Sequence, residues 1–116
     1  GMRPLIMLMT ALVLCAGSTA ANACLNLTAS ATCAPIAPGP GLETWKIQWN
    51  DTGCCTTAKI YVQDGCSGGF SLAGEVACGA FSYNYVGSAG SNNFLVELWD
   101  GDTFYQSVET GCVTCD

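Results

Sequence analysis

Residues 43–50, with the sequence ETWKIQWN, alternate apolar and polar side chains without interruption. Successive side chains of a β-strand point to opposite faces of the sheet. The pattern therefore puts Trp45, Ile47 and Trp49 on one face and Lys46 and Gln48 on the other. We predict a half-buried strand whose tryptophans lie in the hydrophobic core.

The same alternation recurs in short segments separated by glycine and small polar residues. It predicts further strands at residues 25–29, 57–63, 70–72, 81–85, 94–99 and 103–108. Seven short strands without helical periodicity predict an all-β fold, a disulfide-rich sandwich of two packed sheets.

Three connections follow from this pattern. The strand at residues 57–63 is expected to pair with the strand at residues 43–50, or to neighbour it, with Ala58 facing inward. Residues 87–93 are expected to form a loop. The sequence Asp-Gly-Asp at residues 100–102 is expected to close a hairpin, because glycine tolerates the positive φ of a tight turn.

The N-terminal segment is typical of a secretory signal peptide. Arg3 precedes an apolar run that is too short to span a bilayer, and an Ala-x-Ala pattern ends at Ala23. We expect cleavage after Ala23, so that residues 1–23 are the signal peptide, residues 24–42 a lead-in with the first edge strand, and residues 43–116 the sandwich core. The alternatives are a lipid anchor at Cys24 and a retained assembly helix, as in a pilus-like subunit.

Residues 24–116 contain eight of the nine cysteines, and an even number in a small exported domain predicts four disulfides and an extracellular or periplasmic location. With strands running alternately up and down, the cysteines gather at the two ends of the sandwich. The first cysteine set is Cys24, Cys54, Cys55 and Cys78. The second cysteine set is Cys33, Cys66, Cys112 and Cys115.

A disulfide requires Cα atoms within about 7 Å, so bonds are expected within each set and not between the sets. The adjacent Cys54 and Cys55 are not expected to bond to each other. The pairing within each set otherwise stays open.

Residues 24–116 carry two lysines and nine carboxylates, a net charge of −7. Such a surface disfavours nucleic acid and anionic membranes, so membrane attachment is expected only if the N-terminal segment or a lipid at Cys24 is retained. The chain has no histidine, no Gly-x-Ser-x-Gly motif and no phosphate-binding loop, and we predict no enzyme activity. No cofactor is expected. Calcium is the one metal considered, bound by Asp100 and Asp102 with Asp64 or Glu97.

The predicted hairpin supplies candidate binding residues. Its turn puts Trp99 opposite Phe104 and Glu97 opposite Gln106. If this face points outward, an apolar patch of Leu95, Trp99 and Phe104 is exposed, which is typical of surfaces that bind proteins or carbohydrates. In the opposite interpretation this face points inward, and Leu98 with Tyr105 lies outside.

The order of the segments WKIQWNDTG, AKIYVQDG, FSYNY and NNFLVELWDGDTFYQSVETGC resembles the immunoglobulin-like and fibronectin type III-like modules of secreted bacterial proteins. The shared features are an early tryptophan strand, a strand ending in Asp-Gly and a closing hairpin, over residues 43–112. The resemblance implies an immunoglobulin-like sandwich with a non-catalytic role in adhesion, surface structure or ligand recognition. The rival functions are a small secreted inhibitor or effector that acts through residues 87–93, and a polymer-forming surface subunit that uses an edge strand.

Overall fold

The computed structural model describes residues 27–50 and 55–116. These residues form the strands β1 (Ala29–Cys33), β2 (Leu42–Trp49), β3 (Thr57–Asp64), β4 (Ser71–Ala77), β5 (Ser82–Ser88), β6 (Gly90–Asp100) and β7 (Thr103–Cys115). A short 3₁₀ turn, η3 (Cys78–Ala80), connects β4 to β5. Within these two ranges no helix has the length and apolar character needed to cross a bilayer. The predicted signal peptide, Cys24 and Cys54 lie outside them.

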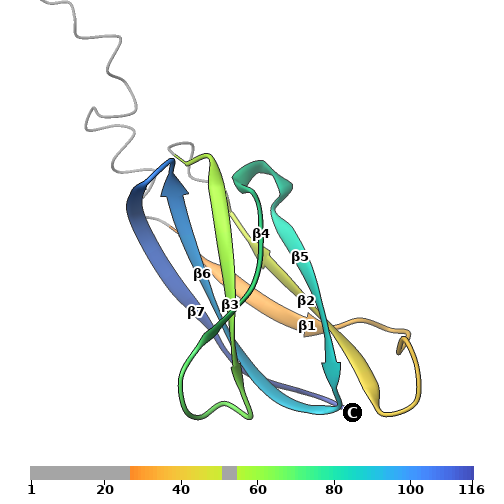
Figure 1. The fold of residues 1–116 in the computed structure, drawn as a ribbon. Coiled ribbons are helices and arrows are strands. Elements are labelled where there is room, and N and C mark those ends of the chain that lie inside the picture. Colours follow the sequence, from red (N-terminus) through yellow and green to blue (C-terminus); the bar gives the residue numbers. More distant parts are fainter. Residues whose placement is uncertain (1–26, 51–54) are drawn as a thin grey trace, which may run out of the picture.

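The strands form two antiparallel sheets that pack face to face, so the predicted all-β, two-layer fold is confirmed (Figure 1). One sheet has three strands in the order β1-β2-β5, and the other has four in the order β4-β3-β6-β7. Along one side of the sandwich, β1 lies beside β7, and a disulfide from Cys33 to Cys115 joins them.

The hydrophobic core lies between the sheets and comes mainly from three central strands. Trp45, Ile47 and Trp49 of β2 are buried, which confirms the orientation predicted from the alternation. The facing sheet contributes the alternate residues Ala58, Ile60 and Val62 of β3 and Phe94, Val96 and Leu98 of β6. Side chains from both sheets thus interdigitate as a single core.

Trp45 is the centre of an aromatic cluster in this core. Its ring centroid lies 6.0 Å from that of Tyr85 and 6.3 Å from that of Phe94. Its indole N–H donates a 3.1 Å hydrogen bond to the carbonyl of Val113 in β7. The bond compensates for removing the N–H from water, so the whole side chain can be buried.

The expectation that residues 43–50 and 57–63 are neighbouring strands is wrong. β2 pairs with β1 and β5, whereas β3 pairs with β4 and β6 in the other sheet. Both strands present an apolar face to the same core, and burying the two faces against each other satisfies both. Alternation shows which side chains are buried but not which sheet a strand joins.

The expected loop at residues 87–93 is also wrong. β5 and β6 run through it, and Ala89 alone separates them. Asn93 is buried: its amide donates to Gln63 (2.9 Å) and Glu109 (2.8 Å), and its carbonyl accepts from the Gly111 N–H. A sequence rich in glycine, serine and asparagine suggests a loop. Here the segment continues two strands, and the Asn93 side chain finds its hydrogen-bond partners within the sheet.

The first strand lies later than expected. β1 overlaps the predicted residues 25–29 only at Ala29, which pairs with Trp49. Before Ala29, the Thr28 N–H donates to the side-chain oxygen of Asn50 at 2.6 Å instead of to a strand carbonyl. The Asn50 N–H still donates to the Thr28 carbonyl at 3.3 Å, so a side chain replaces one of the two main-chain bonds of this pair.

Candidate functional site

The outward side of the four-stranded sheet carries the predicted binding residues. Phe94, Val96 and Leu98 of β6 are fully buried, so the alternate residues Leu95, Glu97 and Trp99 point away from the core. Of the two orientations left open by the sequence, the one with Leu98 outside is therefore wrong.

Strand register arranges the outward side chains in three rows across this sheet. The rows are Leu72-Tyr61-Leu95-Glu109, Glu75-Lys59-Glu97-Ser107 and Ala77-Thr57-Trp99-Phe104. We call these twelve residues the outer sheet face. Leu72 is 55% exposed and Phe104 47% exposed, while Tyr61, Leu95 and Trp99 are half-buried. Trp99 and Phe104 of the predicted patch are directly opposite each other in one row. Leu95 lies two rows away beside Tyr61 and Leu72, with the charged row between.

Trp99 is held by contacts from both neighbouring strands. Phe104 of β7 packs against it with ring centroids 5.5 Å apart and planes at 67°, and the two residues are directly opposite, as the hairpin predicted. From β3, the Lys59 ammonium lies 4.1 Å from the centre of the indole ring, within cation–π range. The indole N–H donates a 3.0 Å hydrogen bond to Glu97. The indole is therefore fixed in one orientation.

The partner of Glu97 differs from the prediction. Ser107 lies opposite Glu97, and Gln106 lies opposite the buried Leu98. The register shifts by one residue between Leu98 and Trp99, a β-bulge that puts one extra residue in β7. Counting residues back from the turn assumes an uninterrupted ladder and misses this shift.

The phenol of Tyr61, on β3 in the outer sheet face, has a raised pKa. Partial burial raises the pKa of its phenol above the usual value of 10.0. A hydrogen bond with Glu97 and the negative charges of Glu97 and Glu75 raise this pKa further, because they oppose formation of a phenolate.

Replacing Glu97 with glutamine is expected to lower the pKa of Tyr61 toward 10.0, because one of the two charges and the carboxylate hydrogen bond are lost. The stability that Tyr61 contributes through this shift is complete below the unfolded pKa of about 10 and is lost as the pH rises through the folded pKa. The ultraviolet absorbance of tyrosinate measures the titration, and subtracting the curve of the Tyr61→Phe variant isolates this residue. An unchanged midpoint in Glu97→Gln would contradict the proposed influence of Glu97.

Within residues 27–50 and 55–116, three disulfides join the ends of the strands. Cys55 bonds to Cys78 at one end of the sandwich, and Cys33 to Cys115 and Cys66 to Cys112 at the other, with Cα atoms 5.6–6.1 Å apart. Each bond joins two members of the same predicted cysteine set. Disulfides are preserved in oxidising compartments, which suggests an extracellular or periplasmic environment.

The residues considered for calcium do not come together. Asp100 pairs with Thr103 at one end of β6, whereas Asp64 pairs with Asn92 near the other end. Across residues 27–50 and 55–116, no group of three or more carboxylate or cysteine side chains is arranged to hold a metal ion.

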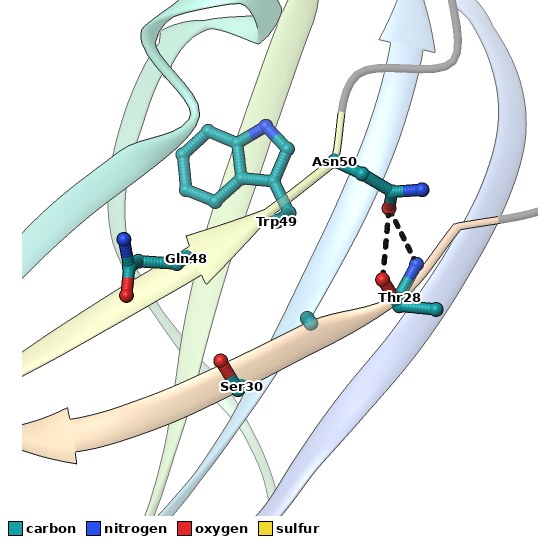
Figure 2. Close-up of a pocket in the computed structure, with 6 residues that line it drawn as sticks. Thr28, Ser30, Gln48, Trp49 and Asn50 are labelled. Carbon is teal, nitrogen blue, oxygen red and sulfur yellow. Dashed lines mark hydrogen bonds between the residues drawn. The ribbon is translucent and has the colours of Figure 1, made fainter.

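Sequence reasoning missed a shallow depression of about 380 Å³ where β1 and β2 meet (Figure 2). It is lined by Thr28, Ala29, Ser30, Gln48, Trp49 and Asn50. Two of its polar groups already bind each other, since both the N–H and the hydroxyl of Thr28 contact the Asn50 side-chain oxygen. Its lining carries no charge, and nothing in the local pattern marks these residues. The outer sheet face, which carries charged and aromatic side chains, is therefore a more specific candidate site than this depression.

Comparisons with protein families, with curated proteins and with solved structures found no match.

Proposed function

We propose that this protein is an exported, non-catalytic β-sandwich module that recognises a ligand through the outer sheet face. The observation that carries the proposal is the exposure of Leu72 and Phe104 beside the half-buried Tyr61, Leu95 and Trp99, on the solvent side of a sheet. Large apolar side chains at the surface, here in two rows on either side of a charged row, are typical of an interaction surface. Trp99 is held rigidly, so little conformational entropy is lost when a partner binds.

The strand order supports a fibronectin type III-like sandwich. In the constant-type immunoglobulin sandwich, the fourth strand belongs to the sheet of the first, second and fifth strands. Here β4 instead extends the sheet of β3, β6 and β7. Of the two resemblances, this order favours the fibronectin type III-like one, and the three disulfides are consistent with export.

Features of three of the four edge strands, β1, β4 and β7, favour recognition over strand-by-strand polymerisation. The edge strand β4 contains a register shift opposite Ile60 and Tyr61, and such irregularities hinder pairing with another chain. On the other side of the sandwich, the Cys33–Cys115 bond holds the edge strands β1 and β7 together. The inhibitor alternative loses its predicted contact loop, because residues 87–93 belong mostly to β5 and β6.

Replacing Phe104 with alanine is expected to weaken ligand binding about tenfold, since it removes the most exposed ring of the face. Arrays of immobilised glycans and of peptides, probed with the labelled protein, measure the effect. Val86→Ala is the matched control, because Val86 is 50% exposed but belongs to β5 in the other sheet. Equal binding by the Phe104→Ala and Val86→Ala variants, or no binding by the unaltered protein, would contradict the proposed function.

A further inference from the structure

We infer that the partner of the outer sheet face is a short cationic polypeptide segment; this inference rests on the proposed function and specifies its ligand. Three properties of the face carry it, namely its charge, the packing of its aromatic rings and its size. The charge argues against a second copy of this chain, the packing of the rings against a carbohydrate, and the size against a folded domain.

The charge of the face excludes a second copy of this chain. The rows contain the carboxylates of Glu75, Glu97 and Glu109 and the single ammonium of Lys59. Two such faces brought together would oppose six carboxylates to two ammonium groups, and like charges at an interface oppose association. The chain as a whole has a net charge of −6, which adds to this repulsion. A complementary partner must be cationic.

The packing of the rings disfavours a carbohydrate. A pyranose ring binds by stacking on an open aromatic face, but contacts from Lys59 on one neighbouring strand and Phe104 on the other already flank the Trp99 indole. The indole N–H, a natural donor to a sugar hydroxyl, is already bonded to Glu97. What remains open is the Phe104 ring and the Leu72 side chain, which suit the alkyl chain of a lysine or the flat guanidinium of an arginine.

The size of the face limits the partner to a segment. Strands lie about 4.8 Å apart and alternate residues about 6.7 Å apart, so four strands and three rows span roughly 14 Å in each direction. A stable interface between folded domains needs about 800 Å² from each partner, well above this area. An extended peptide of a few residues matches it. Glu75 at the β4 edge and Glu109 at the β7 edge are placed to pair with its cationic groups.

The test uses three short fluorescent peptides in which every second residue is serine and the residues between are alternately leucine and one of lysine, glutamine or glutamate, so that both kinds of side chain lie on the same side of the extended peptide. Fluorescence anisotropy with the full chain measures each dissociation constant at low and at physiological salt. We expect the lysine peptide to bind at least about tenfold more tightly than the glutamine peptide, with the difference decreasing as salt increases, and the glutamate peptide to bind most weakly.

Two variants, each with its own control variant, show whether the peptide binds at the outer sheet face. Glu75→Gln is expected to weaken binding of the lysine peptide about threefold, whereas Asp116→Asn removes the same charge from the exposed last residue, outside the face, and is expected to leave it unchanged. Phe104→Ala is expected to weaken it about tenfold and Val86→Ala not at all.

Equal affinity for the lysine and glutamine peptides would overturn the inference that the partner is cationic. If that binding still depends on Phe104, or if Phe104-dependent binding to a glycan is found instead, the proposed recognition by this face stands and only its ligand class is wrong. If Phe104→Ala and Val86→Ala bind every probe alike, both the inference and the proposed function fail.

Discussion

Replacing Trp45 with alanine is expected to lower the free energy of unfolding by about 4 kcal/mol, a large part of the stability of a domain of this size. The side chain is completely buried, contacts both sheets through Tyr85 and Phe94, and donates a hydrogen bond to Val113. The substitution would leave a cavity at the centre of the core and remove the hydrogen bond to the Val113 carbonyl in β7. Chemical denaturation followed by far-ultraviolet circular dichroism measures the change.

Two further variants separate burial from hydrogen bonding. Trp45→Phe keeps most of the apolar volume but removes the bond to Val113, and is expected to cost about 1–2 kcal/mol. Trp99→Ala removes the same side chain from the solvent side of the sheet and is expected to cost less than Trp45→Ala, because Trp99 is only half-buried. A smaller loss for Trp45→Ala than for Trp99→Ala would show that the core is not centred on β2.

Removing the Cys33–Cys115 bond by substituting both cysteines with alanine is expected to destabilise the protein more than removing either of the other two bonds. In the chain-entropy description a cross-link limits the unfolded chain, and the effect grows with the length of the closed loop. A separation of 82 residues corresponds to about 4.5 kcal/mol, against about 3.4 kcal/mol for the 23 residues between Cys55 and Cys78.

The Cys33–Cys115 bond also has a structural role, since it connects edge strands of the two sheets and its Cys115 end is buried in the core. Denaturation of the double variants C33A/C115A, C66A/C112A and C55A/C78A under non-reducing conditions gives the ranking. A variant C55A/C78A less stable than C33A/C115A would contradict the argument from loop length.

The alternation in the sequence was sufficient to identify the buried side chains of the central strands. A period of two is a local property of a strand, so the alternation at Trp45, Ile47 and Trp49, and at Ala58, Ile60 and Val62, was sufficient to assign their faces. The Asp-Gly turn was likewise a local signal, and it correctly placed Trp99 opposite Phe104. For the candidate site, the sequence thus supplied three of the five large apolar residues of the outer sheet face.

The way in which the strands combine into sheets could not be predicted from local patterns. Leu72 and Tyr61 join the site because β3 pairs with β6 and β4 pairs with β3. Strand pairing depends on main-chain hydrogen bonds, which are the same for every residue type and so leave no pattern in the sequence. The assignment of β2 and β3 to different sheets, the bulge that turns Gln106 inward and the continuation of β6 through Asn93 all arise from contacts between residues far apart in the chain. Local patterns fix the face of a side chain, whereas its neighbours across the sheet are fixed by which arrangement buries all the apolar faces at once.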